Sequence, residues 1–275
     1  MSYPAWLFAL SVVFILLERL LPRVPGQRIL RRGIWNDVVY LVFNGNYLGL
    51  LVALVLSRLF EAIDPERAAF VAFMRDQPQW LQFVTLLFVI DFVQYLVHNL
   101  LHRVPVLWEF HKVHHSIEQL DWIGNWRFHW FEVFVYQFFL YPLAGVFGFS
   151  GPVMFWQGVL STAAGHFAHA NLRVHVGPLK YFFNSPEMHI WHHTHDDAGP
   201  VNRNFGVTLA VWDWLFGTAY LPAWDPKRLG FAGIEKFPGT LLGQMVFPFA
   251  RMLRLSVLLL IAPAAFPLIL SACAS

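Results

Sequence analysis

Histidine is the residue type whose placement points to chemistry in this 275-residue sequence. All 13 histidines lie between His98 and His195, and ten of them form four short groups. The groups are spaced H-x3-H, H-x2-H-H, H-x2-H and H-x2-H-H along the chain. In chain order the ten are His98, His102, His111, His114, His115, His166, His169, His189, His192 and His193. Neutral imidazole is a common metal ligand, so this clustering predicts a metal site.

The number of clustered histidines predicts two metal ions. Residues at i, i+3 and i+4 share one face of a helix, so each group can direct its imidazoles toward a common point. A zinc site takes about four ligands, so ten imidazoles suit two ions with about five ligands each. Imidazole binds zinc, copper, iron and nickel, and the spacing does not choose among them. His129, His175 and His195 stand alone, and we expect supporting or structural roles for them.

Four carboxylates lie near the histidine groups. Glu109, Glu132 and Glu187 are the nearest in sequence, and we expect them to accept hydrogen bonds from ligand imidazoles or to be solvated charges. Asp91 lies seven residues before His98, inside an apolar stretch. An ionisable group in such a place is costly and usually functional. Asp91 could therefore orient a ligand or carry a proton path, or it could make a polar contact between helices.

The composition indicates a membrane protein. Charged residues make up 13% of the chain, apolar residues 57%, and the mean hydropathy is +0.50, whereas soluble domains carry about 25% charged residues. The single cysteine, Cys273, excludes an intramolecular disulfide framework and thiolate-rich metal sites. The net charge of +2 gives no sign of a nucleic-acid partner. The first apolar stretch ends in Glu18 and Arg19 without a small-residue cleavage pattern, so we expect a retained helix.

The hydropathy pattern predicts an all-α, multi-pass transmembrane bundle that forms a single domain over 1–275. A spanning helix needs about 20 mostly apolar residues. Five regions meet this need, at about 4–22, 37–60, 79–101, 131–170 and 252–272. The fourth is too long for one span and contains Gly148, Gly151 and Pro152, which are typical of a turn. It therefore predicts a hairpin of two helices, at about 131–148 and 153–169.

Basic residues predict which side the histidines face. Of the 19 lysines and arginines, all but Arg58, Arg67 and Arg75 lie on one side of the predicted spans. The positive-inside rule makes that side cytoplasmic. The long polar segments 102–130 and 171–250 lie there too, so we expect a cytoplasmic, histidine-rich helical cap that holds the two metals. A metal transporter or sensor is the alternative, but its histidines should line the middle of the spans.

Redox chemistry fits this setting better than hydrolysis does. The chain has no H-E-x-x-H motif and no G-x-G-x-x-G motif. It also lacks a haem-attachment, flavin or iron–sulfur motif, so electrons would have to come from a separate reductase. A bis-histidine haem protein needs facing pairs within the bilayer, and H-x2-H-H is a different pattern.

At these residues the chain resembles the fatty acid hydroxylase superfamily, also called the sterol desaturase family. It is most similar to the alkylglycerol monooxygenase and bacterial sterol desaturase-like branches. The resemblance covers about 85–220, and its segments are DFVQYLVHNLLHRVPVLWEFHKVHHS, NWRFHWFE, GHFAHANLRVHVGPLKYFFNSPEMHIWHH and NRNFGVTLAVWDWLFGT. Two positions depart from the family pattern, Asn99 in place of arginine and Trp130 in place of proline. Both departures leave the histidines intact.

The resemblance implies a non-haem di-iron oxidoreductase of lipid metabolism that acts on a hydrophobic substrate. Its cofactors would be two iron ions, with O2 as co-substrate, and its ligands the ten grouped histidines. The product would come from hydroxylation or desaturation of a C–H bond of a lipid. The enzyme would lie in the inner membrane of a bacterium or the endoplasmic reticulum of a eukaryote, beside its reductase. We expect an apolar substrate cleft between the third span and the hairpin, lined by Phe and Trp.

Overall fold

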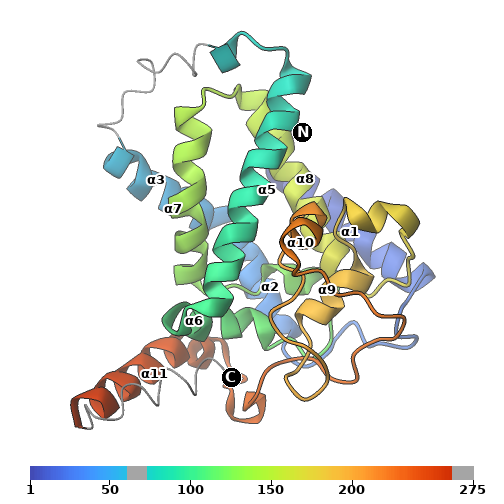
Figure 1. The fold of residues 1–275 in the computed structure, drawn as a ribbon, viewed down its shortest axis with the longest axis vertical. Coiled ribbons are helices and arrows are strands. Elements are labelled where there is room, and N and C mark those ends of the chain that lie inside the picture. The colour runs from blue at the N-terminus through green and yellow to red at the C-terminus, as the bar shows by residue number, and fades with distance from the viewer. Residues whose placement is uncertain (61–72, 262–275) are drawn as a thin grey trace.

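The computed structural model describes residues 1–60 and 73–261, and helices are its regular elements (Figure 1). No β-strand occurs in these two ranges, where backbone pairing between segments is limited to isolated bridges. The prediction of an all-helical protein is therefore confirmed for the described part of the chain. The longer helices are α1 (Tyr3–Leu20), α2 (Ile34–Val42), α3 (Gly49–Phe60), α5 (Gln79–Arg103), α6 (Pro105–His115), α7 (Trp130–Val146), α8 (Gly151–His169), α9 (Pro186–His192), α10 (Val211–Phe216) and α11 (Leu241–Ile261).

Three helical segments are long and apolar enough to cross a membrane. They are α1, the continuous segment Ile34–Leu56 that joins α2 to α3 through a π-helical turn, and α5. The fourth predicted region forms the expected hairpin of α7 and α8, although neither arm is among these three candidates. The turn between the arms contains Gly148 at φ 68°, and Pro152 lies in the first turn of α8. The fifth predicted span, 252–272, begins within α11, and its residues 262–272 lie outside the described residues.

The bundle brings the histidine-bearing helix ends together. Helix α5 packs against both arms of the α7–α8 hairpin, and α1 packs along α8 while α3 packs along α7. The C-terminal ends of α5 and α8 carry His102 and His169. Helices α6 and α9, which carry the two H-x2-H-H groups, contact those same two helices. Four histidine groups that are distant in sequence therefore meet at one end of the bundle.

Two buried carboxylates fix the first two spans to that end. Glu18, in the last turn of α1, accepts hydrogen bonds from the backbone N–H groups of Trp122 and Asn171 at 2.9 and 2.8 Å. Asp37, in the first turn of α2, accepts from the Arg127 guanidinium at 2.5 and 2.8 Å. A second guanidinium, that of Arg31, lies 2.8 Å from the same carboxylate. Buried charges are tolerated only when paired in this way, so these contacts fix the ends of α1 and α2, two of the candidate spanning segments, beside the histidine groups.

Two more carboxylates hold the loop that follows α9. Asp91 on α5 accepts hydrogen bonds from the backbone N–H of Thr208 and Leu209 and from the indole N–H of Trp212. Asp213 accepts from the backbone N–H of Phe205 and Gly206. Asp213 thus pins this loop through its backbone. Burial raises the pKa of the Asp213 carboxyl, while the hydrogen bonds from Thr218 and the two backbone groups lower it.

The Asp37 contacts lead to a stability prediction. Replacing Asp37 with alanine would leave two buried guanidinium groups short of a partner, which typically costs about 3–5 kcal/mol. The control is Asp225→Ala, because Asp225 also pairs with an arginine, Arg23, but its side chain is 52% exposed. The control should lose at most about 1 kcal/mol. Unfolding of both variants in detergent, followed by tryptophan fluorescence, checks this; equal losses would contradict the structural role of Asp37.

Candidate metal centre

Nine of the ten grouped histidines converge into two sets in which the candidate ligand atoms all lie within 4.8 Å of one another. The first set has five members, which are His98, His102, His111, His115 and His192. The second set has four, which are His114, His169, His189 and His193. The two sets adjoin, since the ring centroids of His115 and His193 are 4.6 Å apart. The structure thus places the histidines as five plus four, where the sequence predicted about five and five.

Helical geometry explains how the groups divide. Successive residues are about 100° apart around a helix, so i and i+4 point within about 40° of each other while i and i+3 diverge by about 60°. On α6, His111 and His115 therefore join the first set and His114 joins the second. On α9 the opposite division occurs, with His192 alone in the first set. Each H-x2-H-H group thus supplies candidate ligand atoms to both sets. From the sequence, all three histidines of a group were expected to point toward one common point.

The spacing of the ring nitrogens matches one coordination shell in each set. Two nitrogens that are each about 2.1 Å from one ion and at right angles are about 3.0 Å apart. In the first set, Nε2 of His115 lies 3.2 Å from Nε2 of His102 and 3.0 Å from Nε2 of His192. In the second, Nε2 of His189 lies 3.0 Å from that of His169 and 3.2 Å from that of His193. Both sets therefore have the dimensions of a metal site.

The hydrogen bonds made by Nδ1 show that the Nε2 atoms of the first set face each other as acceptors. The Nδ1–H of His98 donates to the carbonyl of Phe205 at 2.8 Å, and that of His111 donates to Glu132 at 2.7 Å. A neutral imidazole that donates from Nδ1 carries a lone pair on Nε2. Yet the Nε2 atoms of His98 and His111 are 3.2 Å apart. Two lone pairs at this distance repel unless a cation lies between them.

The second set contains an equivalent pair. The Nδ1–H of His114 donates to the Arg127 carbonyl at 3.3 Å, and that of His169 donates to the Gly165 carbonyl at 2.9 Å. Their Nε2 atoms face each other at 3.1 Å. Burial lowers the pKa of His114 well below its ordinary value, and the neighbouring histidines lower it further. The same holds for His111. These rings are therefore neutral, and protonation does not place an N–H between the facing Nε2 atoms. The two sets of nitrogen atoms instead fit two cations.

His166 is the grouped histidine that lies apart. It precedes His169 by three residues, so its side chain points about 60° away around α8. Its ring packs against Phe14 and Trp122 at centroid distances of 5.5 and 5.1 Å. The position one full turn before His169 is Gly165, where a β-carbon would lie 2.4 Å from the Asn125 side chain. The structure thus offers no fifth imidazole to the second set from α8, and ligation by His166 is not supported by its placement.

Among the expected supporting carboxylates, Glu132 contacts a candidate ligand, His111. It lies in the first turn of α7, is buried, and fixes the ring of His111 through the 2.7 Å contact with Nδ1. Glu109 instead accepts from Lys112 at 2.7 Å. Glu187 binds His175 and the backbone N–H of Val176. These two carboxylates shape the surrounding structure and contact neither set.

Asp91 also acts away from the ligand rings. Its three hydrogen bonds go to the loop at 208–212, and none of them reaches a histidine. That loop continues from Phe205, whose carbonyl orients His98, so Asp91 positions a ligand through the backbone. The alternative of a polar contact between segments describes the observed contacts better than a proton path.

The three lone histidines make local contacts. His129 caps α7, because its Nδ1 accepts from the Phe131 N–H, and its Nε2–H donates to the Met245 carbonyl. His175 is exposed and pairs with Glu187 at 2.9 Å. His195 is buried and lies 2.6 Å from Asp197. All three contact groups other than the nine converging histidines, which agrees with the structural roles expected for them.

The loop 202–206 contains functional groups that the sequence indicated only indirectly. Asn202 and Asn204 adopt left-handed backbone conformations at φ 58° and 57°, which asparagine tolerates better than most residues. The side chain of Asn202 hydrogen-bonds His102, and that of Asn204 donates to the Met188 carbonyl on α9. The Arg203 carbonyl accepts from Nδ1 of His192. Backbone carbonyls have no sequence signature, so this one was not identified from the sequence.

A cavity of about 450 Å³ leads from the histidines into the bundle. His98, His111, His114, His169 and His189 line one end of it. Its walls come from α5 and from both arms of the hairpin, as the sequence predicted, but its lining differs from the prediction. Among the described residues, Trp126 and Phe128 are the Trp and Phe that line it. Aliphatic side chains, tyrosines and the amides of Gln94, Gln137 and Gln157 make up much of the rest.

Comparison with known proteins identifies relatives of this chain. A model of the fatty acid hydroxylase family matches residues 83–218. Ornithine lipid hydroxylase OlsE of Rhizobium tropici is 30% identical over 249 residues, which are 87% of this chain and 73% of the relative. Alkylglycerol monooxygenases of Xenopus tropicalis and Homo sapiens are 30% and 28% identical over about half of this chain, and the matches span 31% and 28% of their own lengths. No solved structure matches the chain.

The division into two sets predicts how metal content responds to mutation. We expect His115→Ala to empty the first set and His193→Ala the second, so that each variant retains about one of two metal ions per chain. His166→Ala should retain both, because the ring of His166 lies outside either set. His175→Ala is the exposed control. Elemental analysis of the purified, folded variants measures this. Loss of metal in His166→Ala, or full retention in either of the first two, would contradict the assignment.

Proposed function

The chain belongs to the fatty acid hydroxylase family, and from this membership we propose that it is a membrane-bound di-iron oxygenase that hydroxylates a C–H bond of a lipid. The observation that carries the proposal is the pair of facing imidazole sets at the end of the cavity. The five-plus-four arrangement fits two ions that each keep room for a further ligand. Among the metals that imidazole binds, iron has the redox chemistry that this family's oxidations require.

The overall reaction balances with one O2 and two electrons. One oxygen atom enters the C–H bond to give an alcohol, and the other leaves as water together with two protons. Two iron ions bound by the histidines would supply the redox chemistry that activates O2. The two electrons come from a separate reductase, because the chain has no flavin, haem-attachment or iron–sulfur motif of its own.

The protein's own residues bind the substrate and protect the reaction. The cavity runs along α5 from His98 to Leu86, which is about 18 Å at 1.5 Å per residue. This length accommodates part of an acyl chain, and the apolar walls contribute about 25 cal/mol per Å² buried. Glu132 and the carbonyl of Phe205 hold His111 and His98 at the reacting end. The mainly apolar wall also limits the access of water to the reacting carbon.

The substrate we propose is a lipid with a polar headgroup. The names of the relatives refer to ornithine lipid and to alkylglycerol, both of which combine a polar part with apolar chains. The histidines lie at helix ends, where the bundle meets the polar segments. A lipid anchored there by its headgroup places a carbon at a fixed depth beside the histidines. The relatives' names favour hydroxylation over desaturation on the same site.

We further propose a single domain over 1–275 whose histidine end faces the cytoplasm. The loop 21–33, the α5–α6 junction and the segment after α8 all lie at this end and carry most of the basic residues. The positive-inside rule then makes it cytoplasmic. The location would be the inner membrane of a bacterium or the endoplasmic reticulum of a eukaryote. The alternative of a metal transporter or sensor is disfavoured, because the histidines gather at one end of the spans.

The substrate proposal predicts both the position and the chain-length dependence of oxidation. Reconstituted enzyme is supplied with 18O2, reductant and a series of lipids that share a headgroup and differ in chain length. Mass spectrometry of the products should locate one 18O atom at a constant distance from the headgroup. A new oxygen that tracks the methyl end, or activity confined to a water-soluble substrate, would contradict the proposal.

A variant that shortens the cavity gives a second readout of the same series. Gly158 lines the cavity, and a β-carbon there would meet only Tyr3, at 3.9 Å. In Gly158→Leu the larger side chain should fill the far end, so that long-chain lipids lose activity roughly tenfold more than short ones. Gly151→Leu is the matched control on the same helix, because Gly151 is outside the cavity lining and has open space around it. Equal effects of the two variants would argue against this cavity as the substrate site.

A further inference from the structure

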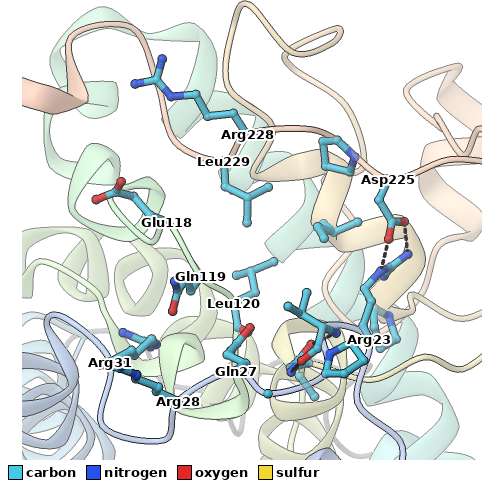
Figure 2. Close-up of a pocket in the computed structure, with 18 of the residues that line it drawn as sticks. Arg23, Gln27, Arg28, Arg31, Glu118, Gln119, Leu120, Asp225, Arg228 and Leu229 are labelled. Carbon is cyan, nitrogen blue, oxygen red and sulfur yellow. Dashed lines mark hydrogen bonds and ion pairs between the residues drawn. The ribbon is translucent and has the colours of Figure 1, made fainter.

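A second hollow opens on the protein surface beside the histidine end. Its volume is about 660 Å³, and it is lined by the loop 23–32 that follows α1, by 118–120 after α6, and by 225–229 (Figure 2). A neighbouring hollow of about 430 Å³ shares five lining residues with it, which are Arg31, Arg32, Glu118, Gln119 and Arg228. Together they form an extended surface, which we call the basic hollow. The lipid cavity has no lining residue in common with either part.

Positive charge dominates the main part of this surface. It is lined by two acidic residues, Glu118 and Asp225, and by six basic ones, which are Arg23, Arg28, Arg31, Arg32, Lys227 and Arg228. Three of the six are already paired with carboxylates. Figure 2 shows one of these pairs, Arg23 with Asp225, on one side of the hollow and Arg28 on the other.

Three cations remain available to a partner. Arg28, Arg32 and Lys227 are exposed, and among the described residues no acidic side chain pairs with them. Such a cluster attracts an acidic surface and steers its approach.

The floor of the basic hollow adjoins the second histidine set. Ala170 and Ile190 line the hollow, and each is the chain neighbour of a member of that set, His169 or His189. The hollow therefore reaches the C-terminal end of α8 and the residues Pro186 and Ile190 of α9, while the lipid cavity is lined by His169 and His189 themselves. A helix with its side chains is about 10–12 Å across. A redox centre seated over this floor would be separated from the histidines by little more than one helix.

We propose that the basic hollow is the docking surface for an acidic one-electron carrier protein that reduces the metal centre. This inference rests on the proposed function. Each docking event passes one electron, so two events supply the two electrons that one hydroxylation consumes. The carrier is oxidised by one electron each time, and the two protons enter with the water that is formed. Lipid and reductant thus reach the same centre through cavities that share no lining residue.

The size and position of the surface favour a protein over an anionic lipid headgroup. A headgroup phosphate needs one or two cations, whereas the free cations here come from two segments about 200 positions apart in the sequence. The surface also continues into the neighbouring hollow, beyond Glu118 to Arg127 and Glu235. An area of mixed but mainly positive charge is typical of a transient protein interface.

The test uses an acidic plant-type ferredoxin as the probe and a charge-reversed pair of residues. One double variant carries Arg28→Glu and Lys227→Glu. The control double variant carries Arg103→Glu and Lys236→Glu, two exposed residues outside the basic hollow. Two quantities are measured, the binding of oxidised ferredoxin to the purified protein and the KM for reduced ferredoxin during lipid oxidation. As a measurement that does not depend on the carrier protein, the enzyme is reduced with dithionite and the product of a single turnover is measured.

We expect the Arg28/Lys227 variant to bind ferredoxin at least tenfold more weakly at low salt, with a KM raised to the same degree. The difference should shrink at about 1 M salt, where charges are screened within about 3 Å. The control pair and the chemically driven single turnover should be unchanged. The binding reading does not depend on catalysis, so absence of lipid oxidation in the unmodified protein would count against the proposed function alone.

Two results would overturn the docking proposal. One is equal ferredoxin binding by the two charge-reversed pairs and the unmodified protein. The other is a fall in chemically driven turnover with unchanged ferredoxin binding, which would identify the basic hollow as a site for an anionic lipid headgroup.

Discussion

Facing imidazole lone pairs are the constraint on which this structure depends. In each set, two histidines whose Nδ1–H groups are committed to carbonyl or carboxylate acceptors bring their Nε2 atoms to 3.1 or 3.2 Å from each other. Burial disfavours protonation of such rings, so a cation between them is the arrangement that removes the repulsion. The helix bundle, the buried carboxylates and the loop after α9 all converge on holding these rings in place.

The lipid cavity and the basic hollow are separate, although both adjoin the second histidine set. The lipid cavity runs between α5 and the hairpin, and the basic hollow lies at the C-terminal end of α8 and against α9. Each contacts the second histidine set or its immediate chain neighbours. The carboxylates of Glu18 and Asp37 tie α1 and α2 to the same region. Under the proposed function, a lipid substrate and a protein reductant would therefore use one centre without competing for one entrance.

Much of this arrangement could be predicted from the sequence, and the exceptions have physical reasons. The apolar stretches predicted the all-helical fold, and the glycine–proline break predicted the hairpin. The clustered histidines predicted all nine rings that converge. His166 was grouped with them because sequence spacing does not distinguish a 60° from a 40° rotation when the partner helices are unknown. The Phe205 and Arg203 carbonyls that orient His98 and His192 are backbone atoms, which no residue type reveals. Asp37 and Arg127 are 90 residues apart, so their pairing depends on the tertiary fold.

The most direct test of the account is the metal content and oxidation state of the unmodified protein. Protein purified in detergent under anaerobic conditions and loaded with 57Fe is examined by elemental analysis and Mössbauer spectroscopy. We expect about two irons per chain, both in nitrogen-rich sites, which oxidise together when O2 and lipid are added. A single iron per chain, or two irons that remain unchanged under O2 and lipid, would contradict a di-iron centre built from the two histidine sets.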